Sequence, residues 1–243
     1  MSEAVLKCPM RCLYDILYHK IFLSMVTQEP HFREILATFG RLENNDASAV
    51  VRFGKTEIAC GLFGPVESRT GRDTFAGLIV DVSTRSCVAI PTHYHKHIDS
   101  VVSDIVMQCV DTVRFPFMQL NVSIEVVSDD GSLLSVLGNA VCLALLHSGL
   151  PLVRRVVSFS VAFATESMRV DPDKFTETTA LSQTTLFMAT DSNDPIYIIH
   201  EGDRVTQAQY DNLMKSTQAI CDALYTKLMS GSKDLAPSLR FAR

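Results

Sequence analysis

The sequence predicts a single domain of the α+β class, in which strands and helices mix without strict βαβ alternation. Three observations support this prediction: a tight β-hairpin at Gly54-Lys55, a helix over residues 133–147 that is apolar on nearly every side, and a final amphipathic helix that starts after Thr206. With 243 residues and 47% apolar content, the chain is long enough to bury one large core. No low-complexity linker divides it.

The first half is expected to supply one sheet. Residues 48–53 and 55–63 are apolar strands on either side of the Gly54-Lys55 turn, where glycine fits the tight backbone. Residues 77–83 form a third strand, and residues 118–128 form a fourth because their apolar side chains alternate. A helix is expected between the third and fourth strands, over residues 97–113, where Phe115-Pro116 stops it.

The second half repeats the mixture of strands and helices. Gly149 ends the apolar helix, whose composition predicts burial on all sides. Thr206 and Gln209 form a capping box for the final helix, and Gly231 closes it. The strands expected in this half cover residues 156–164, 180–189 and 195–200. The apolar stripe of the final helix consists of Leu213, Ile220, Leu224 and Leu228.

The two ends of the chain are expected to lie outside the domain, which we place at residues 33–231. Residues 1–32 are an N-terminal extension in which apolar residues recur at helical spacing. This segment fits an amphipathic helix that docks on a partner, and it equally fits a helix packed on its own domain. Asp15 interrupts it, and it is too short to span a bilayer. Residues 232–243 are expected to be a mobile tail.

Composition narrows the functional classes. The net charge of −5 offers no general attraction to nucleic acid, so any such contact needs a local cluster of Arg and Lys. Seven Cys are scattered through apolar segments without paired spacing, which favours reduced, buried thiols of an intracellular protein.

Three separated motifs resemble those of RNase PH-like proteins: GPVESR at 64–69, the stretch at 126–152 that contains DDGSLL, and VDPDKFTE at 170–177. Their order and spacing are similar to those of the RNase PH-like ring subunits of the eukaryotic RNA exosome, from about Arg41 to Gly231. The resemblance implies an RNase PH-like fold (ribosomal protein S5 domain 2-like) and a place in a six-membered ring around an RNA channel. It also implies other RNase PH-like subunits, S1/KH cap subunits, an associated exoribonuclease and single-stranded RNA as partners. The implied location is the nucleus, nucleolus and cytoplasm.

The resemblance also implies where phosphate chemistry would take place. Active members hold inorganic phosphate at a Gly-Ser/Thr-Arg turn before a helix. Here Gly131 and Ser132 match, but Leu133 stands in the position of the arginine. Leucine has neither the charge nor the bidentate fork that suits phosphate.

The motif VDPDKFTE at 170–177 leads to a second difference from active members of the family. In active members, two acids follow the Asp of this motif by six and twelve residues. Counted from Asp171, those positions are Glu177 and Gln183. Glu177 could act as an acid, whereas neutral Gln183 can neither take up a proton nor supply the charge that a divalent cation needs. We therefore expect a degenerate phosphate site and a degenerate acid site.

Three arginines are candidates for RNA contact. The resemblance places the segment after the Gly-Pro-x-Glu motif at 64–67 toward the ring interior, so Arg69 and Arg72 could reach backbone phosphates, and Arg85 is a weaker candidate. The alternative is solvated surface charge or salt bridges to a neighbouring subunit.

Three alternating histidines suggest a metal site that we do not predict. His93, His95 and His97 share one face only in an extended segment, and three parallel imidazoles cannot converge on one tetrahedral ion without a sharp bend. We interpret them as a surface loop before the helix at Ile98, and we expect neither a metal nor a cofactor.

Two functions of different class follow from these motifs. The leading hypothesis is a non-catalytic structural subunit of the exosome ring, which supports 3′-to-5′ RNA processing and degradation, including rRNA processing, by guiding RNA to a nuclease elsewhere in the complex. The alternative is a phosphate-dependent 3′-to-5′ exoribonuclease that acts alone or as a homodimer. Leu133 and Gln183 discriminate between them, and both favour the first.

Overall fold

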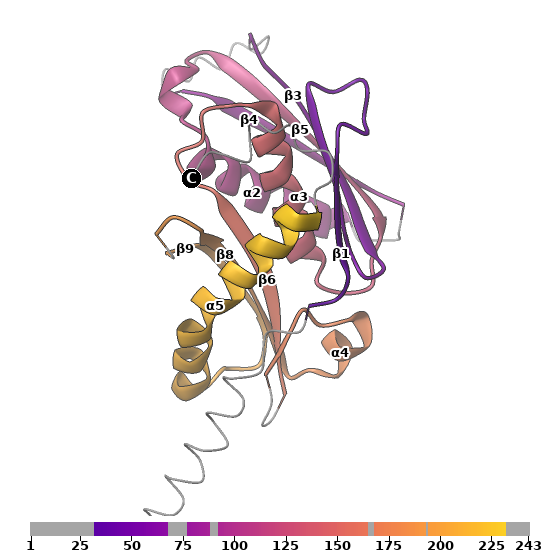
Figure 1. The fold of residues 1–243 in the computed structure, drawn as a ribbon, viewed down its shortest axis with the longest axis vertical. Coiled ribbons are helices and arrows are strands. Elements are labelled where there is room, and N and C mark those ends of the chain that lie inside the picture. The colour runs from indigo at the N-terminus through magenta and orange to yellow at the C-terminus, as the bar shows by residue number, and fades with distance from the viewer. Residues whose placement is uncertain (1–31, 68–76, 88–91, 165–167, 193, 232–243) are drawn as a thin grey trace, which may run out of the picture. The chain divides into compact units, whose positions relative to one another are not determined.

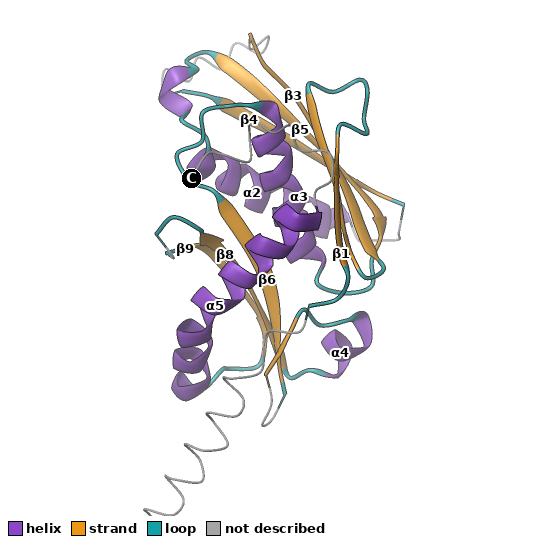
Figure 2. Cartoon of the chain, in the orientation of Figure 1, coloured by secondary structure: helices purple, strands orange, loops and turns teal. Residues whose placement is uncertain are grey.

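The computed structural model describes residues 32–67, 77–87, 92–164, 168–192 and 194–231 (Figure 1). Two β-sheets and four α-helices make up these residues, together with one short 3₁₀-helix, η1 (Thr112–Arg114) (Figure 2). The mixed, non-alternating element order confirms the predicted α+β class. Residues 1–31 and 232–243 are outside the described residues, so the proposed domain boundaries stay predictions.

The first sheet has five strands in the order β1-β2-β3-β5-β4. Their bounds are β1 (Ile35–Phe39), β2 (Ala47–Phe53), β3 (Thr56–Glu67), β4 (Ile79–Ser86) and β5 (Met118–Ser128). All neighbours are antiparallel except β4 and β5, which are parallel and are joined through helix α2 (Thr92–Cys109). The predicted hairpin is present, because Phe53 pairs with Thr56 across Gly54-Lys55 and Gly54 has a φ of 58°.

The second sheet has four antiparallel strands in the order β7-β6-β8-β9. Their bounds are β6 (Val156–Phe163), β7 (Met168–Val170), β8 (Ser182–Ala189) and β9 (Pro195–Gly202). The short helix α4 (Lys174–Thr179) connects β7 to β8, and the long helix α5 (Gln207–Gly231) follows β9. Helix α5 packs against β6 and β1 (Figure 1).

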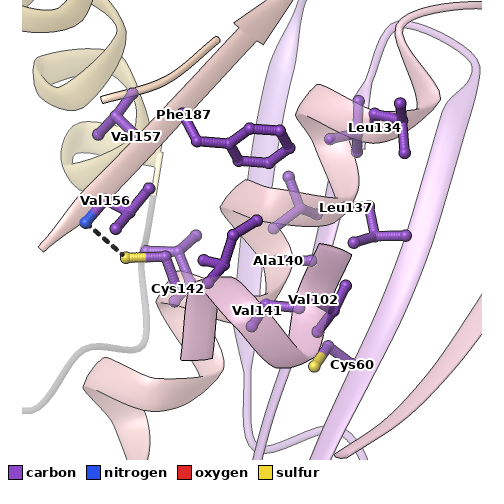
Figure 3. Close-up of a cluster of buried hydrophobic side chains, with 14 of the residues drawn as sticks. Cys60, Val102, Leu134, Leu137, Ala140, Val141, Cys142, Val156, Val157 and Phe187 are labelled. Atoms are coloured by element: carbon purple, nitrogen blue, oxygen red, sulfur yellow. Dashed lines mark hydrogen bonds between the residues drawn. The ribbon is translucent and has the colours of Figure 1, made fainter. Parts of the chain in front are cut away.

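Helix α3 (Leu133–Ser148) forms the centre of the core, because it packs against β2 and β3 of one sheet and β6 and β8 of the other. Every residue from Leu133 to Leu145 is buried, which explains a helix that is apolar on all sides. In the buried cluster, the Phe187 ring of β8 points toward α3 near Leu137 (Figure 3).

The contact between α3 and the second sheet is close. A Cβ at Gly138 would lie 2.5 Å from both the Phe187 ring and the Ser158 hydroxyl, so only glycine allows this packing distance. The next residue, Asn139, donates to the backbone oxygen of Ser158 at 2.7 Å and accepts from its backbone N–H at 3.0 Å. These two bonds satisfy a buried amide and fix α3 on β6.

Several predicted elements differ from the structure. The strands β1 and β7 and the helix α4 were not predicted, because each is too short for a periodic pattern to stand out. Helix α2 begins at Thr92 rather than near residue 97, and it ends at Cys109 before η1 rather than at residue 113. Across the part of the chain that the structure describes, no helix has the length and apolarity needed to cross a membrane.

Candidate functional site at the start of helix α3

The turn before α3 has an unusual backbone. Gly131 has a φ of 92°, and Ser132, the N-cap residue, has a φ of 56° and gives α3 no side-chain cap. The Ser132 hydroxyl instead donates to the backbone oxygen of Pro172 at 2.8 Å. The side chain that normally caps a helix therefore binds a segment distant in sequence, and another group must satisfy the N–H groups.

Residues 172–174 pack directly on this turn. A Cβ at position 131 would lie 2.6 Å from both the carbonyl carbon of Asp173 and the backbone nitrogen of Lys174. The Lys174 N–H also donates to the backbone oxygen of Asp130 at 3.0 Å. Glycine at 131 thus allows the two motifs, which are some forty residues apart, to form one site.

A buried ion pair holds the two motifs together. Arg33 binds both carboxylate oxygens of Asp171, with Nη2 2.7 Å from Oδ1 and Nε 3.0 Å from Oδ2. The same guanidinium donates to the backbone oxygens of Asp130 at 2.9 Å and Gly131 at 3.2 Å. The Asp171 side chain is only 3% exposed, so loss of the Arg33 guanidinium would leave a buried carboxylate without a charged partner.

The backbone N–H of Ser132 is bound by a carboxylate of the chain itself. Glu177 Oε1 accepts from it at 2.6 Å and accepts from Gln183 Nε2 at 2.8 Å. The pKa of Glu177 is raised, and burial is the main cause. The hydrogen bonds from Ser132 and Gln183 and the charge of Lys174 act in the opposite direction and lower this pKa. A charge at a helix N-terminus is favoured by the dipole, and here that charge comes from within the fold.

A lysine bridges the remaining acids. Lys174 Nζ is 2.7 Å from Asp129 Oδ2 and 3.9 Å from Glu177 Oε2. Leu133, which stands where the family's arginine would be, is buried in the hydrophobic core. The acids near the turn are Asp129, Asp130, Asp171, Asp173 and Glu177, and the bases that contact them are Arg33 and Lys174. With Arg169, whose charge acts on Asp173, five acids stand against three bases, and the surplus of two negative charges disfavours an external anion.

The structure brings some of the predicted site residues together, and others lie elsewhere or outside the described residues. It brings Gly131, Ser132, Glu177 and Gln183 together, with Leu133 beside them but turned to the core. Arg85 is exposed on β4, opposite Glu125 of β5. Arg69 and Arg72 lie outside the described residues, so their contact with RNA stays a prediction.

The interpretation of the histidines as a loop was wrong. His93, His95 and His97 lie in the first turns of α2, where a spacing of two puts neighbours on different faces. The signal was Tyr94, which packs on the core at helical spacing from Ile98. Within the described ranges, no group of three or more His, Cys, Asp or Glu side chains is arranged to hold a metal ion.

Sequence reasoning missed Arg33 and Lys174. Arg33 belongs to no local pattern that marks a site, because its partner Asp171 is 138 residues away in the sequence. Lys174 lies inside the recognised motif at 170–177, next to an N-cap Asp173 whose carboxylate accepts from the Thr176 N–H. That capping pattern could have revealed α4 and hence the position of Lys174.

Comparison with known proteins settles the family. Residues 31–151 match the RNase PH family, described as the 3′ exoribonuclease family, domain 1. The chain belongs to the RNase PH family. The rice Rrp46 crystal structure superposes with a TM-score of 0.77 at 19% identity, covering 88% of this chain and 97% of that one. At that identity the likeness establishes the fold, and it confirms the predicted RNase PH-like fold.

Several relatives with similar sequences are named as exosome components. The chain is 23% identical over 202 residues to the exosome complex component RRP41 of Caenorhabditis briggsae, covering 79% of this chain and 84% of the relative. It is 23% identical over 140 residues to the RRP46 homolog of Caenorhabditis elegans, covering 58% of this chain and 64% of the relative. An archaeal exosome core structure gives a TM-score of 0.71 at 19% identity, over 91% of this chain and the whole of that one.

Proposed function

We propose that this RNase PH family chain is a non-catalytic ring subunit of an RNA exosome. The family and the relatives named as exosome components RRP41 and RRP46 support a role in that complex. The observation that carries the non-catalytic part is the contact between Glu177 and the Ser132 N–H at 2.6 Å. The helix end that would receive phosphate already has a ligand.

Phosphate-dependent cleavage of RNA needs an anion site and an acid in one place. Leu133 contributes no charge at the turn, and Gln183 cannot exchange a proton. Glu177 is the remaining acid, and burial raises its pKa. Its Oε1, however, already accepts two hydrogen bonds within the fold, from the Ser132 N–H and from Gln183. Each charge-assisted bond that an arginine would have given is worth ~1.5–3 kcal/mol. This loss supports a structural role.

In the proposed role the chain completes a ring with other RNase PH-like subunits and guides single-stranded RNA toward a nuclease elsewhere in the complex. S1/KH cap subunits and an associated exoribonuclease are the further partners. Arg69 and Arg72 are the candidate phosphate contacts, with Arg85 in a lesser role, and their contribution would depend on salt but not on base sequence. The proposed location is the nucleus, nucleolus and cytoplasm.

Exposed apolar side chains support a partner-covered surface. Large apolar residues on the described surface include Val113, Phe117, Val153 and Phe175, of which Phe175 is 75% exposed. Apolar side chains such as these lose contact with water when a permanent partner subunit covers them, which is the proposed situation in the ring.

Co-expression with RNase PH-like exosome subunits tests the assignment. We expect a stable heterodimer with at least one such subunit in size-exclusion chromatography, and poor solubility or self-association of the chain alone. A well-behaved monomer that captures none of these subunits would count against the ring role. The phosphate-dependent exoribonuclease is the second candidate, favoured by the retained Glu177.

A further inference from the structure

We infer that Glu177 and Gln183 form a latch that closes the start of α3, so that the chain's own carboxylate occupies the position of an external anion. This inference deepens the proposed non-catalytic function and rests on it. It goes beyond the loss of an arginine at position 133, because the Glu177 carboxylate fills the site. Gln183, which stands in the position of the family's second acid, holds Glu177 there.

The first step concerns access. The Ser132 residue is 0% exposed, and its N–H points to Glu177 Oε1 at 2.6 Å. An incoming phosphate oxygen would need that same N–H, so it must first displace the carboxylate. Glutamate is covalently tethered through α4, so its local concentration greatly exceeds that of a free anion.

The second step concerns position 183. The Gln183 amide donates to the same Glu177 oxygen at 2.8 Å. An ionised carboxylate at that position would repel Glu177 instead, since two carboxylates at hydrogen-bond distance cannot both be charged cheaply. Glutamine therefore acts twice: it removes an acid, and it supplies the N–H that holds Glu177 on the helix.

The third step concerns the surroundings of Glu177. Lys174 lies 3.9 Å from its second oxygen, and Asp129 adds a like charge on the other side of Lys174. Glu201 of β9 lies opposite Gln183 in the sheet register, and Glu201 and Glu177 both act on the pKa of Tyr94. Glu201 is therefore a nearby acid that makes no bond to the Ser132 N–H.

Four variants separate the latch from general charge repulsion. Glu177→Ala removes both the charge and the acceptor. Glu177→Gln removes the charge but keeps an oxygen that can accept from Ser132, and Glu201→Ala removes a neighbouring charge without touching the latch. Gln183→Ala removes only the bond that holds Glu177. All three positions, 177, 183 and 201, lie outside the hydrophobic core cluster.

The measurement is the thermal stability of the full chain in inorganic phosphate against chloride at equal ionic strength. Ligand binding to the native state raises Tm by mass action, so we expect Glu177→Ala to gain a saturable rise of about 2 °C or more. Gln183→Ala should show a smaller rise. The parent chain, Glu177→Gln and Glu201→Ala should show none.

Three results would overturn the latch. These are a phosphate response of the parent equal to that of Glu177→Ala, an equal response in Glu177→Gln or Glu201→Ala, or no response in both Glu177→Ala and Gln183→Ala. None of them alters the assembly result, so a failed latch leaves the ring role standing. Loss of the ring role would show instead as failure to form a heterodimer.

Discussion

The starts of α3 and α5 satisfy the same need in different ways. At α5, Thr206 and Gln209 bond reciprocally: the Thr206 N–H donates to Gln209 Oε1 at 3.0 Å, and the Gln209 N–H donates to Thr206 Oγ1 at 3.4 Å. At α3, the N-cap Ser132 gives no such bond, and its N–H is bound by Glu177, 45 residues away. The cap of α5 comes from residues at the start of the same helix, whereas the group that binds the start of α3 comes from a distant part of the chain.

The difference shows what each helix start is for. A capping box needs only neighbouring residues, so it stabilises α5 independently of the rest of the fold. The start of α3 is held by Arg33, by residues 171–174 and by Glu177, all of which are far from it in the sequence. This arrangement fits the proposed degenerate phosphate site, because the Ser132 N–H that could receive an anion is already bound by a carboxylate of the chain.

The largest expected effect comes from breaking the remote support of α3. Arg33→Met leaves the Asp171 carboxylate buried without its partner, and it removes two bonds to the turn. We expect a loss of about 3–5 kcal/mol in the free energy of unfolding, measured by urea denaturation. Arg114→Met is the control, because that arginine is 67% exposed in its pair with Asp111 and should cost at most about 0.5 kcal/mol. Equal losses would contradict the proposed dependence on Arg33.

A second prediction compares the stability cost of replacing two glycines with positive φ, one at each end of α3. Gly131→Ala places a Cβ 2.6 Å from the backbone of residues 173–174, whereas Gly149→Ala meets nothing within 4 Å. We expect Gly149→Ala to cost about 1 kcal/mol from backbone strain alone, and Gly131→Ala to cost roughly 3 kcal/mol or more. Matched urea denaturation curves measure both. Similar costs would mean that residues 172–174 do not press on the turn.

A third effect is confined to the local cap. Thr206→Ala removes the hydroxyl that accepts from the Gln209 N–H, so we expect a loss of about 1 kcal/mol. Thr206→Ser keeps the hydroxyl and should restore most of that loss. Because this cap is independent of the start of α3, its cost should add to that of Arg33→Met in the double variant. Strong non-additivity would show that the two helix starts are coupled.

The smallest effect is a pH dependence at Glu177. Its pKa is raised above the ordinary value of 4.5, chiefly by burial, so the native state binds a proton at Glu177 more readily than the unfolded chain does. The parent chain should therefore gain stability relative to Glu177→Gln as the pH falls from 7 toward 4.5, and gain no more below it. Urea denaturation of both chains across this range gives the difference. A parent that loses stability relative to the variant on acidification would mean that the carboxylate's pKa is lowered.

The comparison also explains what the sequence could predict. The hairpin, the buried helix and the Thr206 cap depend on neighbouring residues, so periodicity and turn chemistry were sufficient to find them. The resemblance supplied Gly131, Ser132, Glu177 and Gln183 as one site. It could not supply the contacts between them, because the bond from the Ser132 N–H to Glu177 depends on the packing of residues 173–174 on the turn, which no local pattern encodes. Arg33 was missed for the same reason, because its partner Asp171 lies elsewhere in the fold. The true start of α2 had a local signal in the helical spacing of Tyr94 and Ile98, which the sequence interpretation did not use.

The most direct test of the central claim is an assay of phosphorolysis. Purified chain is incubated with single-stranded RNA, inorganic phosphate and magnesium, and release of nucleoside diphosphates is measured, both for the chain alone and for its heterodimer. The account predicts no phosphate-dependent release, because Glu177 fills the start of α3 and no arginine stands at position 133. Robust phosphate-dependent shortening that Glu177→Ala abolishes would contradict it and identify Glu177 as a working acid.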